Sequence, residues 1–271
     1  MNKPPKLGSK ILMYALLVIM TIFALYPVWF AVLAAGRPGQ RLYTIDQLGM
    51  IKPIEWTWDN FQALLTETAF LTWIKNSLFV ATLTALAALF IGTSAAFAFS
   101  RFKFYGRQAG LIVFLAIQAF PGILALVDIA HILDAIGMFA NHAGLIMAYL
   151  AGTLVFVIWN LKGYFDTIPV ALEEAAMIDG CGPNQSFVRI ALTLARPALA
   201  VTLLFGFMAG WGDFFLANIL IPAPDAKKTV MVGMYQMANE VSIPWGRFAS
   251  GAILVLIPII LIFLWLHRYL E

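Results

Sequence analysis

Long apolar stretches separated by short polar segments dominate this sequence. Cutting the 271-residue chain at its charged residues leaves six long uncharged runs. They are Ile11–Gly36, Asn76–Ser100, Gln108–Val127, Ala135–Leu161, Pro197–Gly212 and Phe248–Leu266. Most reach the roughly 20 residues that an α-helix needs to cross a hydrocarbon layer about 30 Å thick, and the apolar pattern of the fifth run resumes after Asp213. We therefore expect six transmembrane helices, at about 11–36, 76–100, 108–129, 143–161, 197–221 and 248–267.

The composition supports a membrane protein built from helices. Hydrophobic residues make up 62% of the chain and charged residues 11%, and the mean hydropathy is +0.88. Soluble domains, in contrast, are about half apolar and about a quarter charged. The runs are continuous and lack the alternation of membrane-barrel strands. The predicted fold class is an all-α integral membrane protein, a single transmembrane domain over residues 1–271.

The positions of Lys and Arg predict the orientation. Placing the amino terminus inside puts ten of the 17 Lys and Arg on inner segments. The excess is clearest in the short loop Arg101–Arg107, where the positive-inside rule is most reliable. We expect a multi-pass membrane protein with both termini cytoplasmic. The net charge of +3 needs no nucleic acid to explain it, because the cations sit at membrane ends.

The outward-facing segment Arg37–Lys75 contains one predicted short helix. Asp59 or Asn60 would cap its amino-terminal end, and an apolar stripe begins at Phe61. A helix lying on the bilayer and a docking surface for a partner explain this stripe equally well.

The most polar interruption between the apolar runs is the segment 162–196, predicted to be cytoplasmic. Residues Ala171–Ile178 are mostly good helix formers. Glu173 and Glu174 fall in the first turns of this helix, where carboxylates favour the positive end of the helix dipole. A polar helix at this place is available to a soluble partner.

A glycine corner separates this helix from a second one. Gly180 would end the first helix, and Pro183 can open the second, predicted over Asn184–Ala195. The result is a helix–turn–helix outside the bilayer. The negative charge, together with the small residues Ala175 and Ala176, suits docking of another protein. An amphipathic connector that rests on the membrane surface fits the same residues, so both interpretations stay open on physical grounds.

The same segment resembles a known motif. Glu174-Ala175-Ala176, then Asp179-Gly180, then Ile190-x-Leu192 closely resemble the cytoplasmic "EAA" loop of permease subunits in ABC importers that use a substrate-binding protein. Further short motifs resemble the carbohydrate-uptake branch, and are similar to the smaller permease subunit of maltose and maltodextrin transporters. They are Tyr26-Pro27, Trp58-x-Asn60-Phe61, Asn76-Ser77, Ala96-x-Ala98-x-Ser100-Arg101-Phe102, Phe120-Pro121, Leu161-Lys162-Gly163-Tyr164-Phe165, Pro169-x-x-Leu172-Glu173-Glu174 and Trp245-Gly246-Arg247.

The resemblance implies a type I ABC importer permease whose loop between helices 4 and 5 inserts as a coupling helix into a cleft on a cytoplasmic ATPase. Glu174 would be the carboxylate near that contact, Ala175 and Ala176 its close-packing surface, and Gly180 the corner. The full set of coupling residues that it implies is Glu173, Glu174, Ala175, Ala176, Asp179, Gly180, Ile190 and Leu192. ATPase closure would thereby drive alternating access in the membrane helices, and the resemblance implies that this membrane is a bacterial or archaeal plasma membrane.

The resemblance also implies the partners. They are a second homologous permease subunit, a dimer of cytoplasmic ABC ATPase subunits, an extracytoplasmic sugar-binding protein and membrane lipid. The chain has no Gly-x-x-x-x-Gly-Lys-Ser/Thr phosphate loop. We therefore expect no catalytic residue, metal or cofactor in this chain, with ATP and Mg²⁺ on the partner ATPase. The predicted function is the permease subunit of an ATP-driven importer of maltose, maltodextrin or a related oligosaccharide.

Asp213 is the one carboxylate well inside a predicted span, and such a group is a functional candidate by default. Hydrogen bonding to helix ends is the favoured interpretation, and a place on the substrate pathway beside Trp211 is the weaker one. Two alternative functions stay open. One is an ion-coupled secondary transporter that uses Asp213, which predicts inverted repeats and broken helices that the sequence does not display. The other is an ABC permease for a non-sugar solute such as glycerol phosphate.

Overall fold

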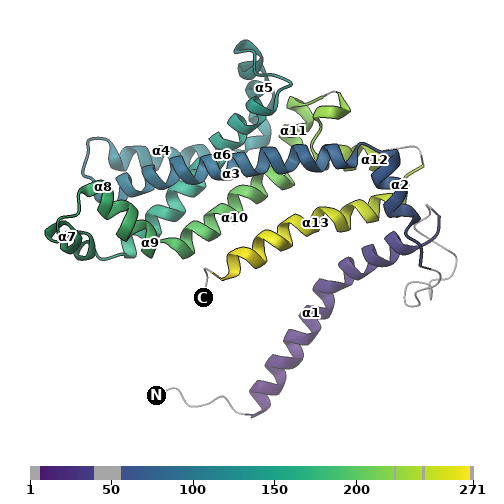
Figure 1. Cartoon of the computed structure of the whole chain (residues 1–271), viewed down its shortest axis with the longest axis horizontal. Helices are drawn as coiled ribbons and strands as arrows, with labels where there is room; N and C mark the ends of the chain where they lie inside the picture. Colours follow the sequence, from purple (N-terminus) through teal and green to yellow (C-terminus); the bar gives the residue numbers. More distant parts are fainter. Residues whose placement is uncertain (1–6, 40–55, 223, 240–241, 269–271) are drawn as a thin grey trace. The chain divides into compact units, whose positions relative to one another are not determined.

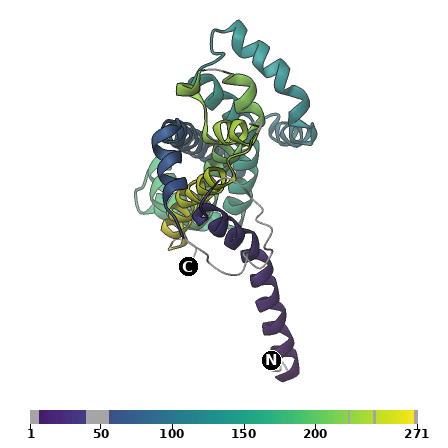
Figure 2. The same cartoon turned by 90° about the vertical axis from the view of Figure 1, so that its right-hand side faces the viewer.

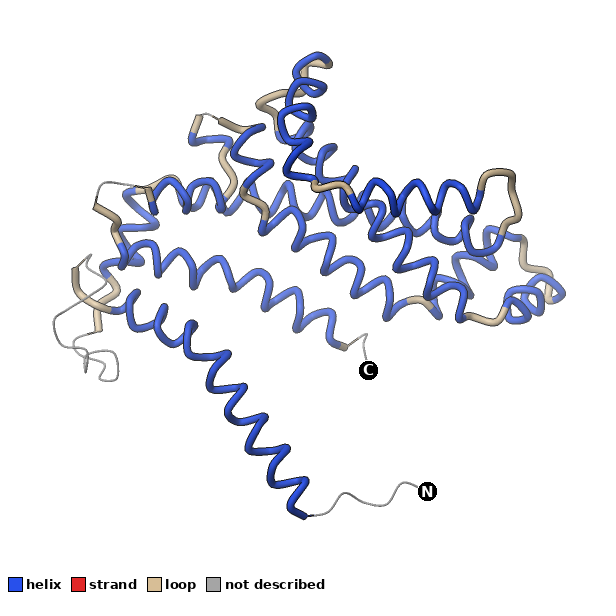
Figure 3. Tube along the Cα trace, turned by 180° about the vertical axis from the view of Figure 1, so that it is seen from behind, coloured by secondary structure: helices blue, strands red, loops and turns tan. Residues whose placement is uncertain are grey.

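The computed structural model describes residues 7–39, 56–222, 224–239 and 242–268. All regular structure in these ranges is helical, and Figure 3 shows loops only where one helix passes to the next. The helices are α1 (Leu7–Gly36), α2 (Asp59–Glu67), α3 (Phe70–Arg101), α4 (Arg107–Ala119), α5 (Leu126–Ala135), α6 (His142–Thr167), α7 (Val170–Ile178), α8 (Pro183–Ser186), α9 (Leu192–Leu194), α10 (Arg196–Gly212), α11 (Phe215–Leu220), α12 (Val230–Ala238) and α13 (Trp245–His267), as labelled in Figure 1. The all-α prediction is confirmed.

Four helices in the described ranges, α1, α3, α6 and α13, are long and apolar enough to cross a membrane by themselves. Two further pairs reach that length only together and are sharply bent. The first joins α4 to the segment Gly122–Ala135 at 85°, and the second joins Pro183–Leu194 to α10 at 78°. By length and composition alone, counting each bent pair as one span gives up to six, the number expected from the apolar runs, although Pro183–Leu194 of the second pair belongs to the 162–196 loop.

The span expected at 108–129 is broken into two helices rather than formed by one straight helix. Phe120 is extended, with φ −76° and ψ 130°, and a 3₁₀ turn at Gly122–Ala125 leads into α5. Pro121 explains the break, because it lacks an N–H and its ring pushes the preceding residue out of the helical region. The bend between α4 and α5 is visible in Figures 1 and 2.

The continuous helix expected at 197–221 is also wrong. The helix α10 ends at Gly212, Asp213 is extended with φ −75° and ψ 134°, and α11 begins at Phe215. The apolar pattern continues through this point, so hydropathy alone does not reveal the interruption.

The chain forms two compact units. Unit 1 comprises residues 1–70 and 234–257. In it the buried side chain of Asn60 donates through Nδ2 to the carbonyl oxygens of Ala35, at 2.9 Å, and Arg37, at 2.7 Å. Asn60 therefore satisfies carbonyls at the end of α1, and the expected capping of α2 by Asp59 or Asn60 is wrong. The hydroxyl of Thr57 accepts from the Asp59 N–H instead, at 3.1 Å.

Unit 2 comprises residues 71–233 and 258–271 and contains a close approach between α3 and α10. A Cβ placed on Gly210 would lie 3.1 Å from the Cα of Ala81, and one on Gly206 would lie 3.3 Å from the Cα of Ala85. Small residues four apart on both helices therefore let the two backbones pack closely, as is common between membrane helices.

Two apolar cores lie along α6 in unit 2. The first surrounds Leu145 and Tyr149 near the start of α6, with partners on α5 and α11. The second surrounds Val157, Leu161 and Phe165 and includes small residues of α3 and α10 together with Ile168 and Ala191. The second core positions the 162–196 loop, because residues at both ends of that loop are buried in it.

Candidate functional site

The 162–196 loop consists of two short helical segments joined by a tight turn. The first is α7, Val170–Ile178, within one residue of the expected helix. The second runs over Pro183–Leu194 and contains a wider π turn at Phe187–Ala191, which residue spacing does not predict. Such turns occur often at functional sites. Within this segment Ala191 is fully buried, and Ile190 and Leu192 are half-buried, so these residues attach the loop to the body of unit 2.

Gly180 forms the corner between the two segments. Its φ is +92°, a left-handed conformation that favours glycine. The N–H of Cys181 donates to the Ala176 carbonyl at 2.9 Å, and the N–H of Gly180 donates to Met177 at 3.1 Å. This is the Schellman pattern of a helix carboxyl end. An added Cβ would meet no atom within 4 Å, so the backbone conformation, rather than space, requires glycine here.

The two faces of α7 have different surroundings. Glu173 and Ala176, three residues apart and therefore on one face, are only 4% and 9% exposed. Glu174, Ala175 and Asp179 lie on exposed positions. The assignment of Ala176 to an outward packing surface is therefore wrong, since this residue packs against its own chain. The outward face carries Glu174 and Ala175, and Ile178 beside them is 87% exposed.

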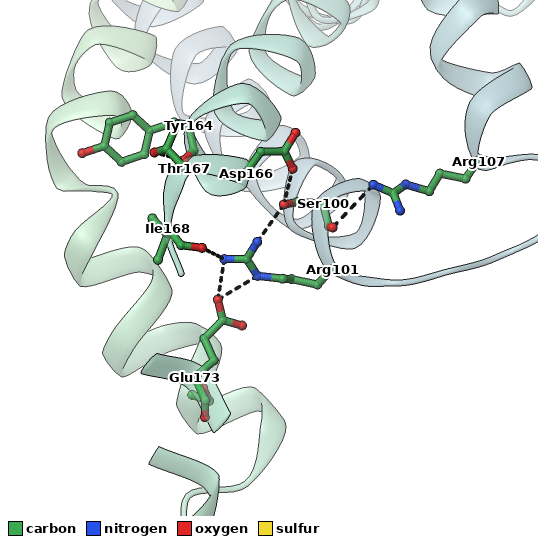
Figure 4. A network of polar contacts seen from close by, with 9 residues as sticks. Ser100, Arg101, Arg107, Tyr164, Asp166, Thr167, Ile168 and Glu173 are labelled. Atoms are coloured by element: carbon green, nitrogen blue, oxygen red, sulfur yellow. Dashed lines mark hydrogen bonds and ion pairs between the residues drawn. The ribbon is translucent and has the colours of Figure 1, made fainter. Parts of the chain in front are cut away.

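The buried carboxylate of Glu173 pairs with Arg101 at the carboxyl end of α3 (Figure 4). Both Nε and Nη2 of Arg101 lie 2.8 Å from Glu173 Oε1. Arg101 also donates to the carbonyl of Ile168 at 3.0 Å and to the hydroxyl of Ser100 at 3.0 Å. The two side chains are 8% and 5% exposed. One guanidinium therefore joins α3 to α7 and to the turn before it.

The same network extends to the end of α6. Ser100 donates to Asp166 at 2.7 Å, and Lys162 donates to the other oxygen of Asp166 at 2.5 Å. Buried Ser186 of α8 also donates to the Glu173 carbonyl at 3.4 Å. The sequence predicted Arg101 as an orienting charge and as part of a motif that resembles carbohydrate permeases, but not its pairing with Glu173. The available signal was the position of Ser100-Arg101 at the end of a span.

Asp213 binds the start of α11. Its Oδ2 accepts from the backbone N–H groups of Leu216 and Ala217, each at 3.1 Å, and from the Tyr149 hydroxyl at 2.8 Å. The helix-end bonding expected for this carboxylate is confirmed. Asp213 and Tyr149 also line a largely apolar cavity of about 880 Å³ formed with residues of α4, α5 and α10. Three hydrogen bonds to one oxygen favour a structural role for this carboxylate.

Trp211 is buried inside unit 2. It is 1% exposed and stacks on Phe207, with ring centroids 5.4 Å apart. In this conformation it presents no open ring face to a sugar. Across the described ranges no group of three His, Cys, Asp or Glu side chains is placed to hold a metal ion.

Comparisons with known proteins agree with this arrangement. The family model described as "Binding-protein-dependent transport system inner membrane component" matches residues 88–271. The maltodextrin transport system permease protein MdxG of Bacillus subtilis is 35% identical over 96% of this chain and 92% of its own length. The galactooligosaccharides transport system permease protein GanQ of the same organism is 33% identical over 94% of this chain and 90% of its own length.

A solved structure supports the fold. The crystal structure of a bacterial ABC transporter involved in the import of the acidic polysaccharide alginate contains a chain that superposes with a TM-score of 0.80, over 100% of both chains, at 21% identity. The fold, the family model and the two relatives lead to one conclusion: this chain belongs to the family of inner membrane components of binding-protein-dependent transport systems.

Proposed function

We propose that this chain is a permease subunit of an ATP-driven, binding-protein-dependent importer of a maltodextrin or related oligosaccharide. The two relatives described above are named for carbohydrates, which favours a sugar over a solute such as glycerol phosphate. The hydrogen bonds of Asp213 to the start of α11 give no support to ion-coupled transport through that residue.

The observation that carries the mechanism is the asymmetry of α7. One face is attached to the chain through the Glu173–Arg101 pair, whereas the other presents Glu174 and Ala175 to the outside. The exposed face docks in a cleft of a cytoplasmic ATPase. Two ATPase subunits bind ATP and Mg²⁺, and this chain contributes none of that chemistry. Both termini of the permease then lie in the cytoplasm.

The contacts of Arg101 provide a route for the movement. A displacement of α7 pulls on Glu173, and Arg101 passes the force to the end of α3, while Ile168 and Asp166 bring α6 into the same network. The close packing of α3 on α10 carries the movement further into the bundle. A second, similar permease completes the pathway, and an external binding protein delivers the sugar to it.

Charge reversal at the docking face tests the proposal. The Glu174→Lys variant is reconstituted with the partner permease, the ATPase and the binding protein, and sugar-stimulated ATP hydrolysis and uptake are measured. Both should fall to background while the permease stays in the membrane. The control is Asp134→Lys, a charge reversal of an exposed carboxylate on α5, which should leave both activities intact. Normal uptake by the Glu174→Lys variant would refute the docking role.

A further inference from the structure

A hollow of about 800 Å³ lies beside the network of Figure 4, between the end of α3 and the end of α6. Its walls are residues 103–109 of the turn from α3 to α4, together with Leu111 and Lys162. The turn is sharp because Gly106 has a φ of +84°. Arg101 links this end of α3 to α7, so the hollow lies on the same side of the membrane as the 162–196 loop.

The charge of the hollow is positive. Lys103, Arg107 and Lys162 line it, and none of its lining residues is acidic. Lys162 is paired with Asp166 at 2.5 Å, and Arg107 donates to the Ser100 carbonyl at a long 3.5 Å. Lys103 is exposed, and the described part of the chain supplies it with neither a hydrogen bond nor an ion pair. An anionic group in the hollow would therefore meet at least two cations, Lys103 and Arg107, that make no direct ion pair in the described part of the chain, although Asp166 lies near Arg107.

An apolar surface continues from the hollow along α4. None of the residues of α4 is buried, and the side chains of Ile112 and Val113 are 61% and 54% exposed. Phe104 and Tyr105 stand exposed at the turn itself, as aromatic residues do at a membrane–water boundary. Cations beside aromatic rings, followed by an exposed apolar helix, match a molecule with a charged head and hydrocarbon chains. A free phosphate ion would use only the cations.

We propose that this hollow binds the phosphate of an anionic phospholipid from the cytoplasmic leaflet, with its acyl chains along α4. The cytoplasmic assignment rests on the proposed function, whereas lipid binding itself does not depend on transport. Lys103 and Arg107 hold the phosphate. Clusters of basic residues next to membrane helices bind anionic lipid in this way.

The test is native mass spectrometry of the full-length chain in detergent, titrated with dioleoylphosphatidylglycerol or dioleoylphosphatidylcholine. Because each cation near an anionic surface strengthens binding roughly fivefold, the double variant Lys103→Gln, Arg107→Gln should bind phosphatidylglycerol about 25-fold more weakly. The control is Lys75→Gln, an exposed lysine at the other end of α3, which should bind it like the unaltered chain. Circular dichroism of both variants checks that they are folded.

Four results would overturn the proposal. They are equal binding of the two lipids, unchanged phosphatidylglycerol binding by the folded double variant, displacement of the lipid by millimolar inorganic phosphate, and loss of the lipid from the assembled importer. The third would identify a free-phosphate site, and the fourth would show that a partner subunit covers the hollow. Retention of phosphatidylglycerol in the assembled importer, lost in the double variant, supports the proposal even where ATP-driven uptake is absent.

Discussion

Breaking the Arg101–Glu173 pair should loosen the 162–196 loop, and removing both charges should restore it. Replacing Glu173 with Met leaves a buried guanidinium without its counter-ion, and replacing Arg101 with Met leaves a buried carboxylate. Breaking one side of a buried pair costs about 3–5 kcal/mol. In the Glu173→Met variant Arg101 keeps its bonds to Ile168 and Ser100, so we expect the lower part of this range or somewhat less, about 2–3 kcal/mol. Arg101→Met removes these bonds as well, so it should cost at least as much.

The lone cysteine provides the assay. Cys181 is the only cysteine of the chain, it is half-buried, and its N–H is bonded to the Ala176 carbonyl at the end of α7. Its alkylation by a maleimide therefore reports local opening of the loop. A loss of about 2 kcal/mol raises the opened population about thirtyfold. Each single Met variant should label faster by roughly that factor.

The double variant decides whether the pair is the cause. With both charges replaced by Met no buried ion remains, so labelling should be slower than in either single variant. The control is Lys162→Met, which breaks an ion pair whose Asp166 partner is 42% exposed. The Lys162 side chain is 15% exposed, but Asp166 remains open to solvent and keeps its bond from Ser100. We therefore expect a cost of about 1 kcal/mol, near the upper end for partly exposed pairs, and labelling that rises only a few-fold. Single variants that label at the original rate, or a double variant faster than both, would show that the Arg101–Glu173 pair does not hold the loop in place.

Three further predictions concern other contacts. Gly180→Ala should speed maleimide labelling of Cys181 several-fold, because a residue with a side chain pays about 1–2 kcal/mol to adopt a left-handed conformation. The control is Gly182→Ala, at φ −70° with open space around it, which should change the labelling rate less than twofold. Asp213→Leu should lower the melting temperature in detergent well below that of Asp213→Asn, since buried N–H groups without acceptors cost about 1–3 kcal/mol each. A smaller drop for the Leu variant would contradict the capping role. Asn60→Ala should lower the melting temperature, because the carbonyls of Ala35 and Arg37 lose the bonds from its amide. Gly246→Ala should also lower the melting temperature, because its Cβ would lie 2.5 Å from the Asn60 amide. An unchanged melting temperature in both variants would contradict the importance of this contact.

Local sequence determined the helices and the corner of the 162–196 loop. Whether a segment is helical and apolar enough to cross a membrane depends on its own residues, which is why α3, α6 and α13 match the uncharged runs. The end of α7 is equally local, because Gly180 supplies a backbone conformation that other residues adopt only at a cost. The motif around Glu174 identified the family from a few residues at fixed spacing.

Only the tertiary structure decided which faces point inward and which distant charges meet. Spacing places Glu173 and Ala176 on one face of α7, but the contacts of α7 with Arg101 of α3 and with Ser186 of α8 decided that this face is buried. Arg101 and Glu173 are 72 positions apart, so their pairing depends on how α3 and α6 end beside each other. At Asp213 the bonds to Leu216 and Ala217 are local, whereas the Tyr149 hydroxyl comes from another helix and could not be inferred from spacing. Apolar helices carry little polar pattern by which to infer such neighbours.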